Sequence, residues 1–359
     1  MAREKVAFLP CASYDLPLLK QQLAKAVVLI GFDLSVFRGK KILLKPNLLS
    51  PSAPEKAVTT HPVFVRAAAE LLLDAGAVVT VGDSPGIYNL PKCLEECGIR
   101  EALKGLPLSF AEFKYPATLK ARAGATLPEF VVAREVMECD AIVNLPKLKT
   151  HCMMTFTCAV KNTYGHVLGL TKGKLHIEAG ADAARFARML VEICYLRKPA
   201  LSLVDAVVAM EGNGPGSGNP RKLGIVLAGT DPLAVDAVAT ALIGFKQENI
   251  PIFAEAIKLG FGTWDMDRIE ISGARMEDLA VTDFVPADRE TPVTFIPLPP
   301  AVEKRLRDML AIKPRIDNAD CTRCGECVRI CPAKVMAVKN KRIRIDRTLC
   351  IRCFCCQEI

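Results

Sequence analysis

Residues 321–332 read CTRCGECVRICP, and residues 350–356 read CIRCFCC. The first run spaces four cysteines as C-x2-C-x2-C-x3-C before a proline, and the second run begins the same pattern again. A two-residue gap lets successive sulfur atoms face one centre, so three cysteines of a run can hold three corners of one [4Fe–4S] cluster. The fourth cysteine of each run reaches the other cluster. The spacing therefore predicts a small α+β module of the two-cluster, bacterial ferredoxin type over residues 317–359.

The pattern divides seven predicted ligands into two sets. They are Cys350, Cys353 and Cys356 with Cys331 for one cluster, and Cys321, Cys324 and Cys327 for the other. The second set lacks a fourth cysteine, which the pattern places directly after Ile359. We expect either that the natural chain continues or that this cluster has an open corner. Cys355 has no place in the pattern and is either a substitute ligand or a small buried thiol.

Two other uses of cysteine fit less well. A structural zinc site needs four ligands, and a disulfide framework does not require two copies of this spacing. Thiolates that bind iron belong in a reducing compartment, so we expect a cytoplasmic protein. The first residues, MAREKVAFLP, lack the apolar stretch of a secretory signal, and no apolar run approaches a membrane span.

The net charge of +8 does not indicate a nucleic-acid partner. Residues 317–359 carry nine Lys/Arg against five Asp/Glu, and two clusters with their thiolates, each of charge about −2, would nearly neutralise that excess. The remaining positive charge is spread thinly along the chain. We expect an electron-transfer partner protein and an anionic small molecule as partners, and the sequence leaves a homodimer open.

The first 290 residues alternate between short aliphatic runs and helix-like stretches. Uninterrupted aliphatic runs are typical of strands that are buried on both faces, so we predict a doubly wound α/β domain with a mostly parallel sheet. The predicted domain boundaries are 1–295 for this domain and 296–316 for a linker with a short helix near 301–310. The predicted strands are 41–44, 78–81, 141–143, 201–204 and 224–228, and the predicted helices are 62–75, 183–196 and 232–243.

Polar loops follow each predicted strand, at 45–47, 82–86, 144–151, 211–216 and 229–232. Ligands of open α/β sheets bind beyond the carboxyl ends of the strands, so we predict that these five loops share one edge and build one site. Ordinary turn chemistry is the alternative explanation for each loop taken singly.

A helix that begins near Thr150 is predicted to place His151, Thr155, Cys158 and Asn162 along one side. The nearby lysines would then form a pocket for a carboxylate or phosphate, unless they lie on a solvated loop. His176 is expected on a mobile or surface segment. The candidate residues for proton transfer are His151, Asp83 and Glu211, and the candidates for substrate binding are Lys45, Asn47, Lys147, Lys149, Lys161, Asn162 and Asp231.

Asp231 also fits the N-cap of a helix with Pro232 at its first position. No P-loop pattern is present, and no motif indicates a flavin or a metal besides the two predicted [4Fe–4S] clusters.

Four segments together resemble a known family, the large family called domain of unknown function 362. They are the segment NLPKLKTH at 144–151, KN-x-x-G at 161–165, EG-x-GP at 211–215 and DP-x-AVD at 231–236. Members of this family often carry a C-terminal two-cluster ferredoxin module. The resemblance implies an iron–sulfur protein but does not imply a particular reaction.

Three functions remain open at this point. The first is an oxidoreductase that passes electrons from the clusters to an anionic substrate at the strand ends. The second is an electron carrier or redox accessory protein whose large domain docks a partner. The third is a non-redox enzyme, such as an isomerase or hydrolase, with structural clusters.

Overall fold

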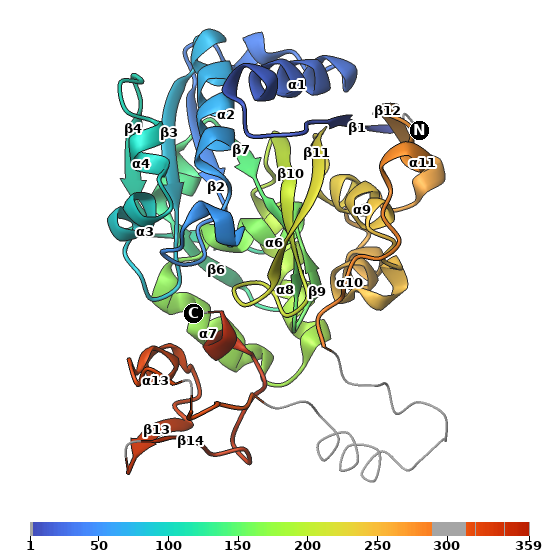
Figure 1. Ribbon diagram of the computed structural model, residues 1–359. Helices are drawn as coiled ribbons and strands as arrows, with labels where there is room; N and C mark the ends of the chain where they lie inside the picture. Colours follow the sequence, from blue (N-terminus) through green and yellow to red (C-terminus); the bar gives the residue numbers. More distant parts are fainter. Residues whose placement is uncertain (1–2, 289–313, 320, 341, 359) are drawn as a thin grey trace.

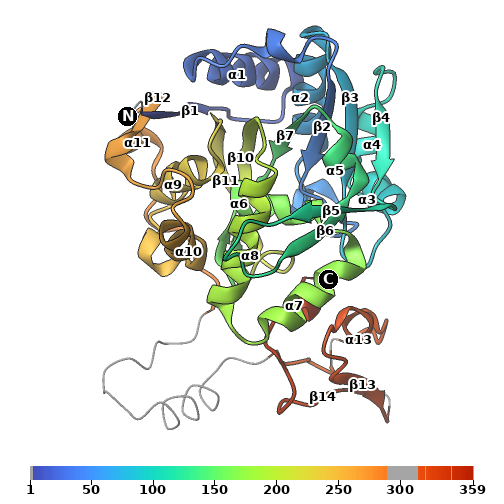
Figure 2. The ribbon, with the colours of Figure 1, turned by 180° about the vertical axis from the view of Figure 1, so that it is seen from behind.

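The large domain is built around a mixed sheet with helices on both faces (Figures 1 and 2). The computed structural model describes residues 3–288, 314–319, 321–340 and 342–358. The sheet follows the order β12-β1-β11-β10-β7-β2-β3-β4, and β8 and β9 extend it beside β10. Its strands are β1 (Glu4–Pro10), β2 (Lys41–Pro46), β3 (Val78–Asp83), β4 (Ser109–Glu112), β7 (Ala141–Leu145), β8 (Lys147–His151), β9 (Thr155–Thr157), β10 (Leu201–Glu211), β11 (Asn219–Gly229) and β12 (Ile269–Gly273).

Helices connect most of these strands, and a separate hairpin stands beside the sheet. The hairpin is β5 (Pro116–Lys120) with β6 (Glu129–Ala133). The α-helices of the large domain are α1 (Leu16–Leu29), α2 (Pro62–Asp74), α3 (Leu90–Glu96), α4 (Ile99–Ala102), α5 (Arg134–Glu138), α6 (Ala159–Asn162), α7 (Gly169–Ala179), α8 (Ala183–Leu196), α9 (Pro232–Leu242), α10 (Pro251–Leu259) and α11 (Met276–Leu279). Short 3-10 turns are η1 (Leu34–Phe37), η2 (Pro54–Lys56), η3 (Thr163–His166), η4 (Gln247–Asn249) and η5 (Met266–Arg268).

Strand direction confirms the predicted mostly parallel α/β domain. Along the main path of the sheet, β11 is antiparallel to both of its neighbours, and the other adjacent strands pair in parallel. The five predicted aliphatic runs fall within β2, β3, β7, β10 and β11, and the three predicted helices are α2, α8 and α9.

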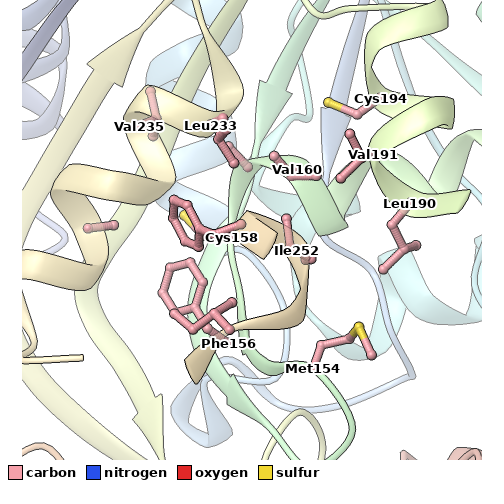
Figure 3. Close-up of a cluster of buried hydrophobic side chains, with 14 of the residues drawn as sticks. Met154, Phe156, Cys158, Val160, Leu190, Val191, Cys194, Leu233, Val235 and Ile252 are labelled. Carbon is pink, nitrogen blue, oxygen red and sulfur yellow. The ribbon is translucent and has the colours of Figure 1, made fainter. Parts of the chain in front are cut away.

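Side chains of each strand alternate between two apolar layers. In β1, Ala7 and Leu9 pack in the layer that holds α1 and α2, whereas Val6 and Phe8 pack with α8, α9 and α10. Because consecutive strand residues point to opposite faces, burial of both faces requires unbroken aliphatic runs. Figure 3 shows part of the second layer, where Phe156 and Val160 lie close to side chains of α8, α9 and α10.

The reversed direction of β11 corrects one prediction. The residue pair Ser202–Gly229 sets the carboxyl end of β11 beside the start of β10. Asp231 therefore lies at the opposite edge of the sheet from the ends of β2, β3, β7 and β10, so the five predicted loops do not share one edge. Asp231 Oδ1 accepts from the backbone N–H of Leu233 and Ala234, which confirms its other predicted role as the N-cap of α9.

The helix predicted to begin near Thr150 is also wrong. Residues 147–151 form β8, the chain turns back as β9, and α6 begins only at Ala159. Cys158 is buried in the apolar layer of Figure 3, whereas Asn162 lies in a polar cluster. The polar spacing of four, three and four imitated a helical face because it spans a strand, a turn and a short helix.

The C-terminal module contains α13 (Glu326–Ile330), the hairpin of β13 (Met336–Lys339) with β14 (Arg342–Ile345), and the turn η6 (Cys355–Gln357). It lies next to α7 in both views of the ribbon (Figures 1 and 2). The predicted short helix at 301–310, most of the predicted linker and the predicted boundary at 295 lie outside the described residues. No helix among the described residues is long and apolar enough to cross a membrane.

Candidate functional site

A cavity of about 320 Å³ lies between the large domain and the C-terminal module. The strand-end loops after β2 and β3, together with β8, α6 and the first turns of α7, form one wall. Residues 329–332 and 334, with Cys355 and Glu358, form the other wall. Six predicted site residues line this cavity, which are Lys45, Asn47, Asp83, Lys149, Lys161 and Asn162.

Lys45 and Asp83 form a buried ion pair at the ends of β2 and β3, with 2.9 Å between Nζ and Oδ1. Asp83 also accepts from the backbone N–H of Leu48 and Ser84, so it joins the two loops. Burial lowers the pKa of Lys45, and the charge of Asp83 opposes this effect. An added Cβ at Gly165 would overlap both members of the pair, which explains why a glycine is needed at that position.

Three further lysines line the cavity without a carboxylate within ion-pair distance in the described residues. Lys149 Nζ donates to the carbonyl oxygens of Val58 (2.8 Å) and Pro215 (3.3 Å). Burial, reinforced by the charge of Lys161, lowers the pKa of Lys149 to about 7. Lys172 Nζ donates to the carbonyl oxygen of Ser84, and burial lowers its pKa to about 8.

Lys161 makes no hydrogen bond or ion pair within the described part of the chain. Its ammonium group lies 6.0 Å from the centroid of the Tyr164 ring. Burial lowers its pKa, and the charge of Glu358 opposes this effect. A desolvated ammonium group without a hydrogen bond is costly, so this site favours an anion.

Asn162 is positioned by a chain of amide hydrogen bonds. Asn144 Nδ2 donates to Ala159 O at 3.0 Å, and Asn162 Nδ2 donates to Asn144 Oδ1 at 2.8 Å. The amide of Asn144 at the end of β7 therefore fixes α6, and with it the neighbouring Lys161. This is the structural reason for the asparagines of two of the quoted motifs.

His151 lies behind the cavity rather than in its lining. Its Nδ1 accepts from the backbone N–H of Met153 and Met154, so the ring proton is on Nε2, which lies 3.1 Å from Glu358 Oε1. Burial lowers the pKa of His151 to about 4, so the imidazole is neutral at pH 7. Glu358 itself lines the cavity. Burial would raise its pKa, but His151 and Lys161 lower it to about 2.

Lys147 and Glu211 do not line the cavity. Lys147 is buried in an ion pair with Asp205 at 2.9 Å and donates to Tyr14 Oη at 2.8 Å. Glu211 Oε2 accepts from the backbone N–H of Val285 at the far end of β10. With Asp231 and His151, four of the ten predicted site residues in the large domain are therefore outside the cavity lining.

Helix α7 supplies residues that the sequence analysis missed. Gly169, Lys172, Gly173 and His176 all line the cavity, and their spacing of three, one and three is that of one helical face. The expectation that His176 lies on a surface segment is wrong, since its ring is buried and stacks on Phe186 with centroids 4.2 Å apart. The spacing of these four residues in the sequence could have predicted that they share one face of a helix.

Several contacts hold the C-terminal module against the large domain. Tyr88 Oη donates to Glu326 Oε2 at 2.6 Å, and Ser217 Oγ donates to Gln357 O at 3.1 Å. An added Cβ at Gly216 would meet the backbone of Glu358, so the loop between β10 and β11 approaches the module closely. The cavity is therefore closed by both parts of the chain.

Four thiols gather in the module as the sequence predicts for one cluster. Cys331, Cys350, Cys353 and Cys356 line one small cavity, and this donor set fits a [4Fe–4S] cluster. Among the described residues no three His, Cys, Asp or Glu side chains are close enough to hold a single metal ion.

The other cysteines of the module are placed as follows. Burial raises the pKa of Cys327, and the nearby Cys321 and Cys324 add to this effect, so the three thiols lie near one another. Cys355 is buried and lines the larger cavity rather than the one lined by the four thiols.

Comparison with known proteins agrees with both parts of the chain. A model of the family "Domain of unknown function (DUF362)" matches residues 42–241, and a model of a 4Fe-4S dicluster domain matches residues 313–359. The thylakoid-associated protein sll1697 of Synechocystis sp. is 38% identical over 222 residues, which are 62% of this chain and 68% of that protein.

The fold was also compared with solved structures. Lactate racemase apoprotein from Thermoanaerobacterium thermosaccharolyticum is similar with a TM-score of 0.41 and 11% identity, over 64% of this chain and 54% of that chain. Because the first family model covers more than half of the sequence, the chain belongs to the family domain of unknown function 362, with a 4Fe-4S dicluster domain at its C-terminus.

Proposed function

We propose that this protein is an iron–sulfur oxidoreductase that passes electrons from two [4Fe–4S] clusters to an anionic small molecule held in the cavity between its two parts. The observation that supports this proposal is the position of Cys331, which lines both the cavity of the four thiols and the larger, lysine-lined cavity. A ligand of one cluster would therefore lie at the wall of the substrate site. When bound, the two clusters would supply electrons one at a time, so a two-electron reduction draws one from each.

The lysines of the cavity bind the anion and hold protons near it. Reduction of a carbon–carbon or carbon–oxygen double bond consumes two electrons and two protons. Lys149 and Lys172, with pKa values of about 7 and 8, can each hold a proton at Nζ and release it near neutral pH. The oxygens of Asp83 are engaged by Lys45, Leu48 and Ser84, so the lysines are the better proton donors.

The proposal is tested with anaerobic protein whose clusters have been reduced with dithionite and then freed of reductant. Small carboxylates with a reducible double bond are added singly, and the return of the visible absorbance of the oxidised clusters is followed. A substrate of the expected class reoxidises the clusters with saturable kinetics, and its reduced product is identified by mass spectrometry. The Lys149→Met variant should react at least about ten-fold more slowly, since it removes a buried charge at the site.

The matched control is Lys104→Met, because Lys104 is 76% exposed and remote from the cavity. It should react like the parent protein. Reoxidation that is slow with every anion, but fast with a soluble electron-acceptor protein, would favour the carrier function instead. Equal rates in the Lys149→Met variant and the parent would place the substrate elsewhere.

A further inference from the structure

The charge of the cavity narrows the class of ligand. Five lysines line its wall in the large domain; Lys174 is exposed, and the ammonium groups of the other four face two carboxylates. Lys45 is neutralised by Asp83, which leaves Lys149, Lys161 and Lys172 against Glu358 alone. His176 does not add to this charge, because burial lowers its pKa to about 4. Apart from the exposed Lys174, the wall of the large domain taken together with Glu358 therefore has an excess of two positive charges when its lysines are protonated.

The clusters do not account for this excess. Without Glu358, which is already set against the lysines, residues 317–359 carry nine Lys/Arg against four Asp/Glu, and this excess offsets two clusters of charge about −2 each. Lys334 and Arg329 of the module also line the cavity and belong to that balance. The lysines of the large domain are thus available to a ligand.

The three lysines are spread over the cavity wall rather than gathered at one point. Lys149 and Lys172 make their hydrogen bonds in different places, Lys149 with the carbonyl oxygens of Val58 and Pro215 and Lys172 with that of Ser84. Lys149 comes from β8, Lys161 from α6 and Lys172 from the first turn of α7. The charge of Lys161 lowers the pKa of both Lys149 and Lys172.

Lys172 lies in the first turn of α7, close to the start of that helix. Gly169 is the first residue of the 11-residue α7 and lines the cavity, and no side chain caps this end. Unpaired N–H groups of a first helical turn add positive potential next to Lys172. A second anionic group is therefore favoured at that end, apart from one between Lys149 and Lys161.

We propose that the ligand is a small dicarboxylate, with one carboxylate between Lys149 and Lys161 and the other at Lys172 and the start of α7. Two negative charges neutralise the excess, and a carbon chain between them lets each charge reach a different one of the separately anchored lysines. A phosphate places its charges on one centre and suits this arrangement less well. This inference rests on the proposed function, because it assigns the ligand of the same cavity.

The test uses the holoprotein with oxidised clusters and isothermal titration calorimetry under anaerobic conditions. Succinate and butyrate have the same number of carbon atoms and differ by one carboxylate, and inorganic phosphate is the compact dianion. We expect succinate to bind at least about ten-fold more tightly than butyrate and than phosphate. Lys161→Met and Lys172→Met should each weaken succinate binding by about ten-fold or more, and Lys104→Met should leave it unchanged.

Folding of each variant is checked by its iron content and its circular dichroism. Equal affinity for succinate and butyrate would overturn the dicarboxylate, and tighter binding of phosphate would replace it with a compact dianion. Unchanged succinate binding in both folded lysine variants would show that these lysines do not bind the ligand. Succinate offers no double bond between carbons for reduction, so its binding is independent of electron transfer. Succinate binding together with a lack of cluster reoxidation by every unsaturated dicarboxylate would refute the proposed function and leave the ligand class standing.

Discussion

Individual lysines show how differently one residue type can be accommodated at a buried position. Lys45 and Lys147 each have a carboxylate partner at 2.9 Å. Lys149 has only carbonyl oxygens, so burial lowers its pKa to about 7. An ion pair keeps a buried ammonium charged, whereas a carbonyl leaves it able to lose its proton. The first kind of lysine maintains the fold, and the second is suited to a binding site.

Replacement of Lys147 by Met should lower the free energy of unfolding by about 3–5 kcal/mol. The change leaves Asp205 buried without its cation, although the carboxylate still accepts from Tyr14 Oη and from the backbone N–H of His61. Urea unfolding followed by circular dichroism measures the effect, with Lys104→Met as the exposed control. A loss below about 1 kcal/mol, as for a surface pair, would contradict this assignment.

Cys324→Ala should cost one cluster's worth of iron, about four of about eight atoms. Cys324 is exposed, so the large domain should keep its circular dichroism spectrum and its unfolding midpoint. Iron and sulfide analysis of anaerobically purified protein measures the loss. Cys355→Ala is the matched control in the same module and should retain the iron of the parent, because Cys355 does not line the cavity of the four thiols. An equal loss in that variant would make Cys355 a ligand.

Anion binding in the cavity should weaken as the pH rises from about 6.5 to 9. The pKa values of Lys149 and Lys172 are lowered to about 7 and 8, chiefly by burial, so both ammonium groups lose their protons across this window. An anion binds the protonated forms and is therefore coupled to proton uptake. Calorimetry in buffers of different ionisation enthalpy should detect uptake near pH 7.5. An affinity that stays constant over this range would exclude both lysines from the site.

Short elements of this fold depend on hydrogen bonds from other elements. Helix α6 has only four residues, and such a helix is not stable alone. Asp236 of α9 accepts from the backbone N–H of Ala159 at 2.6 Å and of Val160 at 3.1 Å, and the two helices are thereby joined. Since α6 carries Lys161 and Asn162, a carboxylate on another helix positions part of the cavity wall.

The pH dependence of stability tests this arrangement of the two helices. Burial raises the pKa of Asp236 to about 7, against the backbone hydrogen bonds from Ala159 and Val160, whereas an unfolded aspartate has a pKa of about 3.9. Between about pH 4 and 7 the folded chain thus binds one more proton than the unfolded chain at this group. The contribution of Asp236 to stability is full below about pH 4 and is lost as the pH rises to about 7, by about 1.4 kcal/mol per pH unit.

Asp236→Asn should remove this contribution to the pH dependence while lowering stability at acidic pH. Urea unfolding at several pH values, compared between the variant and the parent protein, gives the difference. Parallel curves for the two proteins would show that Asp236 does not titrate in this window.

At the scale of the whole molecule, the candidate site belongs to neither part of the chain alone. The loop after β3 meets the module through Tyr88 and Glu326, and the hairpin of β10 and β11 meets it through Ser217. The family model ends at residue 241, within α9, and the dicluster model begins at residue 313, so neither describes the contact between the two parts. A site shared between two parts can respond to a change in either one.

Removal of iron should therefore weaken anion binding without unfolding the large domain. Clusters organise the short elements of the module, and the wall formed by Cys331, Cys355 and Glu358 depends on them. After chelation under oxidising conditions, circular dichroism should retain the helix signal of the large domain, and calorimetry should show succinate affinity reduced by about ten-fold. Unchanged affinity in the iron-free protein would assign the whole site to the large domain.

The sequence alone determined the central strands and the cysteines that gather in the module, since both are local properties. Aliphatic runs predicted the strands, and the spacing of Cys331, Cys350, Cys353 and Cys356 predicted the set that lines one cavity. A cysteine motif encodes its geometry within a few residues, and a fully buried strand is recognisable from its composition.

The tertiary structure decided which polar residues share a site. Asp231 lies at the opposite edge of the sheet because β11 is antiparallel to its neighbours. Lys147 is buried in an ion pair with Asp205, whereas Lys149, two residues further along the chain, lines the cavity. Lys172 joined from α7, and Glu358 from the module. Strand direction and the packing of distant segments depend on contacts between residues far apart in the chain, and no local pattern records them.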